Sequence, residues 1–260
     1  MTVSENIKGQ LKSRLNEQQK RIVKRVLCRL FYGGSLSKLA LASGTDKYSH
    51  HYTKYYQHHF GLLRKKKLNI LEIGIGGYDD PRAGGSSLRM WGIYFPNSNI
   101  FGIDINDKTY HDEHRIKTFR GSQIDKDFLI KVIKEIGTVD IIIDDGSHYN
   151  DHVITTFKIL FPLMNINGIY VVEDLQTSYW DDFVAGQKWD GSKDLTASHT
   201  SVNYFKTLID GLNYEEFVDD EYKPSYFDKH IISMHFYHNI LFIYKGLNNE
   251  GSNILGKRFL

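Results

Sequence analysis

The segment VDIIIDDGSHYNDH, residues 139–152, decides the fold. Its first five residues suit a buried strand, and they run directly into Asp144, Asp145, Gly146, Ser147 and His148. A near-continuous apolar strand is typical of a parallel sheet that is covered on both faces. Two acids and an imidazole at the end of such a strand indicate a functional site at the edge of the sheet. The alternative is that Asp144 caps a helix and His148 is a solvated loop residue.

Length and composition narrow the classes of protein. The 260 residues fit one large domain, or one domain with a small appendage, and 41% of them are apolar. A net charge of +2 gives no case for a nucleic-acid partner. The single cysteine, Cys28, excludes an intramolecular disulfide and a cysteine-built zinc site. No apolar run is long enough for a membrane span, and the first ten residues lack a signal-peptide core, so a cytoplasmic protein is expected.

Outward from this segment, strands alternate with helices. The connection between residues 237 and 240 is short enough for an antiparallel hairpin at the end of the pattern. This inventory predicts an α/β fold with a doubly wound, Rossmann-like sheet of the class I methyltransferase type. The predicted strands are 68–73, 99–104, 115–120, 139–144, 168–173, 230–237 and 240–245, and the predicted helices are 85–95, 125–136 and 150–163.

The N-terminal region differs from this pattern. Residues 4–31 predict a basic amphipathic helix, which suits a membrane surface or a partner helix, or packing on its own domain or on a twin subunit. Residues 48–60 are rich in His and Tyr, which favours an aromatic cover over the cofactor more than a metal cluster. We therefore expect residues 1–60 to form a helical arm and cover, and residues 61–260 to form the methyltransferase domain. A homo-oligomer is also expected.

Glycines and acids follow the first two strands, where a doubly wound sheet binds its ligand. Glu72, Gly74 and Gly76 lie in the motif E-x-G-x-G-G, and Asp104 ends the second strand 32 residues after Glu72. An acid at that position suits hydrogen bonds to ribose hydroxyls. Ser87, which with Ser86 is expected to cap the next helix, lies at an N-terminus suited to a ligand carboxylate. All these residues are candidates for cofactor binding.

The turn after the third strand and the end of the fourth complete the cofactor candidates. Ser122 and Gln123 are suited to an adenine edge, although the same turn is explained equally well by Asp125 as the N-cap of the next helix. Asp144 ends the fourth strand and is included with them.

Three acids converge at the ends of the fourth and fifth strands. Asp145 and Glu173 are separated by 28 residues, enough for one helix and one strand, and Asp174 follows directly. Neighbouring strands bring these ends together, and clustered carboxylates favour a divalent cation between them. An all-oxygen set suits Mg²⁺, with Mn²⁺ as the alternative. His148 lies on the same loop and can take a proton from a hydroxyl group.

Several segments together resemble the metal-dependent sugar O-methyltransferases of macrolide biosynthesis. They are GTDK (44–47), LEIGIGG, GGSSLRMWGIYFPNSNIFGIDI, GSQID, IIDDGSH and VVEDLQTSYW, within residues 40–245. The resemblance implies S-adenosylmethionine as methyl donor, with Thr45 and Lys47 at the cofactor. It implies Mg²⁺ held by Asp145, Glu173 and Asp174, His148 as general base, and a sugar hydroxyl of a glycosylated small molecule or saccharide as acceptor. Those enzymes also carry a substantial extra N-terminal region, for which this chain has about forty residues.

The connection after the fifth strand is long, polar and aromatic. Residues 175–197 are expected to act as a lid, and Thr177, Tyr179 and Trp180 are candidates for acceptor contact. Packing onto the domain is the alternative for the aromatic rings.

Two other functions stay open on the same residues. A non-haem metal oxidoreductase would use His148 with Asp145 and Glu173, but its facial triad needs a second histidine. A non-catalytic binding protein on the same fold would not need the intact acids.

Overall fold

The structure is a computed structural model, and it describes residues 16–252. The described residues divide into two compact units, one formed by residues 16–66 with Arg89–Asn97 and the other by Lys67–Leu88 with residues 98–252. Within residues 16–252, none of the helices is both long and apolar enough to cross a membrane.

The first unit is helical. Asn16 caps α2 (Glu17–Tyr32) through a capping box, which confirms the expected N-terminal helix from residue 17 onward; the part predicted before residue 16 lies outside the described residues. The unit continues with α3 (Leu36–Ser43), α4 (Thr53–Phe60), η1 (Gly61–Leu63) and the later part of α5 (Ser86–Tyr94). Aromatic rings form its core, where Tyr56 and Phe60 of α4 contact Trp91 of α5 at centroid distances of 5.0 and 6.0 Å.

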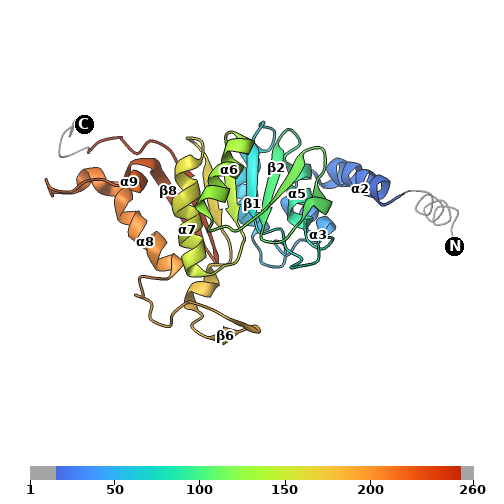
Figure 1. Cartoon of the computed structure of the whole chain (residues 1–260). Coiled ribbons are helices and arrows are strands. Elements are labelled where there is room, and N and C mark those ends of the chain that lie inside the picture. Colours follow the sequence, from blue (N-terminus) through green and yellow to red (C-terminus); the bar gives the residue numbers. More distant parts are fainter. Residues whose placement is uncertain (1–15, 253–260) are drawn as a thin grey trace. The chain divides into compact units, whose positions relative to one another are not determined.

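The second unit is built on one seven-stranded sheet (Figure 1). The strand order is β3-β2-β1-β4-β5-β9-β8, with β8 and β9 antiparallel to each other and β9 antiparallel to β5. The predicted α/β sheet with its C-terminal hairpin is thus confirmed. The strands are β1 (Asn69–Ile73), β2 (Asn99–Asp104), β3 (Ile116–Arg120), β4 (Ile141–Asp144), β5 (Ile169–Val172), β8 (Ile231–Tyr237) and β9 (Ile240–Lys245).

Helices α6 (Lys126–Ile136), α7 (Asn150–Leu160) and α8 (Ser201–Asp210) bury their apolar faces against this sheet. Phe157 of α7 lies at the centre of this core and contacts Tyr170 of β5 and Phe205 of α8 at centroid distances of 5.1 Å each. Burial of this kind stabilises the domain by roughly 1.5–3 kcal/mol for each large side chain. The remaining elements are η2 (Thr109–His111), η3 (Phe161–Leu163), η4 (Leu175–Tyr179), β6 (Phe183–Val184), β7 (Gln187–Lys188), η5 (Gly211–Glu216) and α9 (Tyr226–His230).

The register of the central strands determines where the site lies. Asp144 of β4 pairs with Ile73 of β1 on one side and with Val172 of β5 on the other. The pairing continues beyond the strands, because Asp145 N donates to Ile73 O (3.0 Å) and Glu173 N donates to Asp144 O (2.9 Å). The ends of β1, β4 and β5 therefore lie side by side, and the side chains that follow them share one edge of the sheet.

Candidate active site

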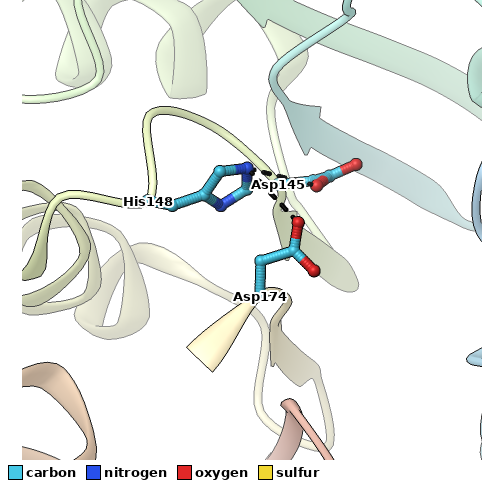
Figure 2. Close-up of side chains that lie close together, drawn as sticks. All are labelled: Asp145, His148 and Asp174. Atoms are coloured by element: carbon cyan, nitrogen blue, oxygen red, sulfur yellow. Dashed lines mark ion pairs between the residues drawn. The ribbon is translucent and has the colours of Figure 1, made fainter. Parts of the chain in front are cut away.

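Asp145, His148 and Asp174 form a compact cluster at this edge (Figure 2). His148 Nε2 lies 3.8 Å from Asp145 Oδ1 and 3.6 Å from Asp174 Oδ2. The side chains are 20%, 20% and 14% exposed in the order Asp145, His148, Asp174, so a ligand can still reach them. The structure therefore brings together the imidazole and two of the three acids that the sequence singles out.

His148 and Asp174 adopt unusual backbone conformations. Their φ angles are +59° and +55°, in the left-handed region that non-glycine residues rarely occupy. Such conformations cost roughly 1–3 kcal/mol each and persist where the surrounding structure enforces them, often at functional sites. Thr177 supplies part of that enforcement, because its hydroxyl donates to His148 O (2.8 Å) and to Asp174 O (3.3 Å).

A second group of acids overlaps the first. Glu72, Asp145 and Glu173 each place a carboxylate oxygen within 4.8 Å of the other two, and Glu72 and Glu173 are buried. The predicted set of Asp145, Glu173 and Asp174 is thus divided between two groups that share Asp145. Ser87 donates to Glu72 Oε2 (2.7 Å), so this hydroxyl serves the acid of β1, where the sequence had suggested a helix cap.

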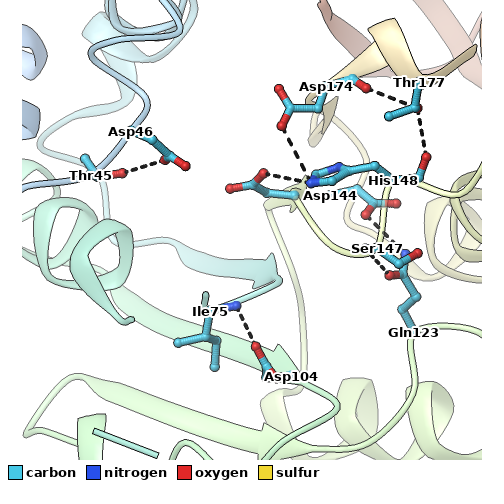
Figure 3. Close-up of polar contacts among 11 residues, drawn as sticks. Thr45, Asp46, Ile75, Asp104, Gln123, Asp144, Ser147, His148, Asp174 and Thr177 are labelled. Carbon is cyan, nitrogen blue, oxygen red and sulfur yellow. Dashed lines mark hydrogen bonds and ion pairs between the residues drawn. The ribbon is translucent and has the colours of Figure 1, made fainter. Parts of the chain in front are cut away.

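Residues 145–149, which join β4 to α7 and carry the candidate base His148, are called the catalytic loop below. A buried polar network centred on Gln123 contacts this loop (Figure 3). Its Oε1 accepts from Ser147 N (2.8 Å), and its Nε2 donates to Asp144 Oδ1 (3.3 Å) and Thr156 Oγ1 (3.1 Å). Tyr170 OH donates to the other carboxylate oxygen of Asp144 (3.3 Å). One glutamine thus connects β4, the loop after it and α7.

Asp144 lies inside the domain, with 1% of its surface exposed. Burial raises the pKa of its carboxyl group to about 7, although hydrogen bonds from Gly146 N, Tyr170 and Gln123 act in the opposite direction. Its inward contacts assign Asp144 to the support of the loop. They do not favour a direct contact with the cofactor, and they exclude the helix-cap alternative, since α7 begins after Tyr149.

Two glycines allow the loops to approach so closely. Gly74 has a φ of +86°, and a Cβ at this position would clash with the carbonyl of Asp145. A Cβ at Gly146 would clash with Oε1 of Gln123. Gly74, the first glycine of the E-x-G-x-G-G motif, is therefore required for contact between the loops after β1 and β4. Gly146 is required because the buried side-chain amide of Gln123 lies where its Cβ would be.

The loop after β1 is fixed by the last residue of β2 and by a lysine that follows this strand. Asp104 accepts from Ile75 N through Oδ2 (3.0 Å) and from Asn106 N through Oδ1 (2.9 Å). Lys108 is 1% exposed, and its Nζ donates to the carbonyls of Asp80 (2.8 Å) and Ala83 (3.4 Å). Asp104 thus lies where the sequence predicts, against the glycine loop, and its role toward a ribose stays a prediction.

The other candidates lie as follows. Thr177 is 2% exposed and bonds to backbone carbonyls, which favours a positioning role over the expected acceptor contact. Tyr179 is 45% exposed, and Trp180 is half-buried.

The remaining cofactor candidates make local contacts. The hydroxyl of Ser122 accepts from Ile124 N (3.4 Å), while Asp125 caps α6 by accepting from Phe128 N (3.0 Å), as expected. In the first unit, Lys47 is buried and Thr45 donates to Asp46 (3.4 Å).

Sequence reasoning missed several supporting residues. Thr156 lies within α7 and Tyr170 within β5, and nothing in the sequence distinguishes their hydroxyl groups from those of other buried threonines and tyrosines. His152 Nδ1 lies 2.8 Å from Ser147 Oγ and so holds the loop from its far side. Ser147 lies in the loop before α7 and His152 in the first turn of that helix, and their spacing of five residues carries no marked signal in the sequence.

The sheet order, the C-terminal hairpin and the acidic edge are those of a class I methyltransferase. A solved structure of the MycE methyltransferase, in complex with Mg, SAH and mycinamycin VI, superposes on 84% of this chain with a TM-score of 0.78 and 43% identity. No protein-family model matches the chain.

Several curated sugar O-methyltransferases are similar to this chain. The mycinamicin VI 2''-O-methyltransferase of Micromonospora griseorubida is 43% identical over 219 residues, which cover 83% of this chain and 54% of that protein. The 8-demethyl-8-alpha-L-rhamnosyl tetracenomycin-C 2'-O-methyltransferase of Streptomyces olivaceus is 44% identical over 84% of this chain and 57% of its own length. The resemblance drawn from the sequence is confirmed, and the chain spans about half the length of these relatives.

Proposed function

We propose that the protein is an S-adenosylmethionine- and Mg²⁺-dependent O-methyltransferase that acts on a sugar hydroxyl of a glycosylated small molecule or saccharide. The observation that carries this proposal is the cluster of Asp145, His148 and Asp174 at the end of β4 and β5, in a fold shared with sugar O-methyltransferases. It combines oxygen ligands for a hard cation with one imidazole suited to proton transfer.

The donor set fits a magnesium ion. Asp145, Glu173 and Asp174 would hold it, with Glu72 close behind Asp145 and Glu173. The chemistry of the donor set supports this fit, because every member of the two candidate groups other than His148 is a carboxylate. A bound divalent ion supplies Lewis acidity toward the acceptor hydroxyl.

The edge of β1 and β2 fits S-adenosylmethionine, which supplies an electrophilic methyl group. Gly74 and Gly76 both have φ angles in the left-handed region. Gly74 makes room for the carbonyl of Asp145, whereas the Cβ position of Gly76 meets no atom closer than 4.0 Å and so leaves space for a ligand. Each carboxylate oxygen of Asp104 accepts one backbone N–H, from Ile75 or from Asn106. Each oxygen therefore keeps a second lone pair that could accept from a ribose hydroxyl. Glu72, Ser87, Ser122 and Gln123, together with Thr45 and Lys47, stay proposed as further cofactor residues.

His148 acts as the general base in this proposal. Its Nε2 takes the proton of the acceptor hydroxyl while the oxygen attacks the methyl group and the sulfur leaves with its electron pair. Asp145 and Asp174 stabilise the imidazolium that forms, since each places a carboxylate oxygen within 4 Å of Nε2. The rigid support from Thr177 and Gln123 keeps the imidazole oriented, which lowers the entropic part of the barrier.

The alternative functions are not favoured. A facial-triad iron site needs two histidines, whereas each candidate metal group in the described part of the chain holds at most one. The finer expectations stay proposals: a cytoplasmic homo-oligomer in which residues 1–60 cover the cofactor.

The direct test is methyl transfer from ¹³C-methyl-labelled S-adenosylmethionine to a panel of uncharged glycosides, with Mg²⁺ or with EDTA, followed by mass spectrometry. We expect a labelled O-methyl sugar with Mg²⁺ only, and none with Asp145→Asn. Transfer that survives exhaustive chelation would overturn the metal requirement. A protein that binds the cofactor and methylates no glycoside would overturn the acceptor class.

A further inference from the structure

The connection between β5 and α8 carries a group of aromatic side chains next to the catalytic loop. Trp189 contacts Trp180 at a centroid distance of 5.6 Å and Tyr149 at 5.7 Å. Phe183 begins the small β6–β7 hairpin and is 70% exposed. We call Tyr149, Trp180, Phe183 and Trp189 the aromatic shelf. Tyr149 directly follows His148, so the shelf begins one residue from the proposed base.

The base of the shelf is held firmly. Asp190 accepts from Asn150 N (3.0 Å), from Asn150 Nδ2 (2.9 Å) and from Asp151 N (3.3 Å), and so caps the start of α7. Asn150 is fully buried and accepts from Ser178 Oγ (2.8 Å). These bonds join both ends of the hairpin segment to the helix that follows His148, so the expected lid is anchored where it meets the site.

The hairpin itself is tied to the same loop. Tyr149 OH donates to Lys188 O (3.1 Å), and Trp189 Nε1 donates to Val184 O (3.1 Å). Figure 1 shows the hairpin, labelled β6, projecting beyond the sheet at the end where α7 begins. Exposed aromatic surface on so short a hairpin has little structural use, since only two residue pairs join its strands.

The four side chains of the shelf are themselves uncharged. Lys193 forms an ion pair with Asp181 (N–O distance 3.1 Å) in the same connection. Asp182 and Lys188 are exposed on either side of the hairpin and bring one charge of each sign. A surface of indole, phenol and phenyl rings fits a ligand with a flat or apolar face.

We infer that the aromatic shelf binds the uncharged, apolar group to which the methylated sugar is glycosidically joined, and that it selects the acceptor. This inference rests on the proposed function. The sugar lies at His148, and the group beyond the glycosidic oxygen lies on Trp180, Phe183 and Trp189. Removing one of these rings weakens acceptor binding through KM and leaves the chemistry at His148 in place.

The test compares two uncharged acceptors with one sugar, methyl α-L-rhamnopyranoside and 4-nitrophenyl α-L-rhamnopyranoside. The sugar is chosen because a relative acts on a rhamnosyl compound. For the wild type we expect kcat/KM to favour the nitrophenyl glycoside by at least tenfold. Phe183→Ala and Trp189→Ala each reduce this preference by about tenfold, the order of one lost aromatic contact. Phe236→Ala, an exposed phenylalanine on the outer strand β8, is the matched control and keeps the preference.

A binding measurement separates the two proposals. Quenching of tryptophan fluorescence by the nitrophenyl glycoside, with S-adenosylhomocysteine and Mg²⁺ present, reports on the shelf without turnover, since two of the three tryptophans lie on it. Methyl transfer to both glycosides with a preference that neither variant changes would overturn the shelf and leave the function intact. Shelf-dependent quenching without methyl transfer would overturn the function alone. Absence of both would overturn both proposals.

Discussion

Replacing Gln123 by leucine tests how the catalytic loop is held. Leucine has a similar volume but neither accepts from Ser147 N nor donates to Asp144 and Thr156. A buried N–H left without a partner costs about 1–3 kcal/mol, and the two lost donor bonds add roughly 0.5–1.5 kcal/mol each. We expect Gln123→Leu to lower the free energy of unfolding by about 2–6 kcal/mol, against the roughly 5–15 kcal/mol of an ordinary domain.

The cost of this substitution depends on pH. Burial raises the pKa of Asp144 from 3.8 to about 7, so between these two pH values the folded protein holds a proton that the unfolded chain has released. The free energy of unfolding therefore falls as pH rises from about 4 to about 7, and the loss is complete above the folded pKa. Above pH 7 the carboxylate relies on the Gln123 and Tyr170 bonds, and without Gln123 its pKa rises further. The difference between wild type and Gln123→Leu is expected to be larger at pH 8 than at pH 6.

Urea unfolding followed by circular dichroism, at both pH values and in EDTA, measures this difference. Gln187→Leu, a substitution of an exposed glutamine on the β6–β7 hairpin, is the matched control and should change the free energy of unfolding by less than about 0.5 kcal/mol. A Gln123→Leu protein as stable as wild type at both pH values would refute the network as the support of the loop. Equal losses at pH 6 and pH 8 would refute the role assigned to the Asp144 bond.

Three further substitutions follow from the site and the core. Asp104→Ala should weaken S-adenosylmethionine binding at least tenfold, roughly the effect of losing one charge-assisted bidentate hydrogen bond. Unchanged affinity in a calorimetric titration would exclude Asp104 from the ribose site. His148→Ala should lower turnover by about 10²–10⁴-fold and leave S-adenosylhomocysteine affinity near wild type; near-normal turnover would exclude a general base at this position. Lys245 donates to the carbonyls of Phe161, Pro162 and Met164 (3.0, 2.9 and 2.7 Å), and burial lowers its pKa to about 8. Since the unfolded chain keeps this proton up to about pH 10.5, stability should rise from pH 8 to 10.5. Lys245→Met should remove that rise and lower the free energy of unfolding at pH 7 by about 1–3 kcal/mol, whereas a rise that persists in the variant would exclude Lys245 as its source.

The sheet could be predicted because its strands are apolar runs that end in marked residues. The strand ending in Asp144-Asp145 and the strand followed by Glu173-Asp174 were placed to within two residues, and the hairpin of β8 and β9 followed from its short connection. Helices α3, α4 and α8 were not assigned, since they have 8, 8 and 10 residues and are shorter than the window over which a helical period can be recognised.

Residue types identified the site, but contacts decided the roles. Asp145, His148 and Asp174 meet as the strand ends imply. Asp144 and Thr177 are predicted ligand contacts in the sequence; in the structure both are buried and hydrogen-bond to the loop, and their roles toward a ligand stay predictions. Side-chain direction alternates along a strand, so neighbouring residues at the end of a strand point in opposite directions. The spacing of residues in the sequence does not show which of the two faces a ligand and which faces the protein interior.

The most direct test of the account is the position of the metal. Crystals grown with Mn²⁺ and S-adenosylhomocysteine give an anomalous signal that locates the ion without assumptions about activity. We predict one peak within about 2.0–2.3 Å of carboxylate oxygens of Asp145, Glu173 and Asp174, with His148 Nε2 outside coordination distance and free to take a proton. A peak bonded to His148 Nε2, or none at this edge of the sheet, would contradict the assignment of His148 as base beside an oxygen-ligated ion.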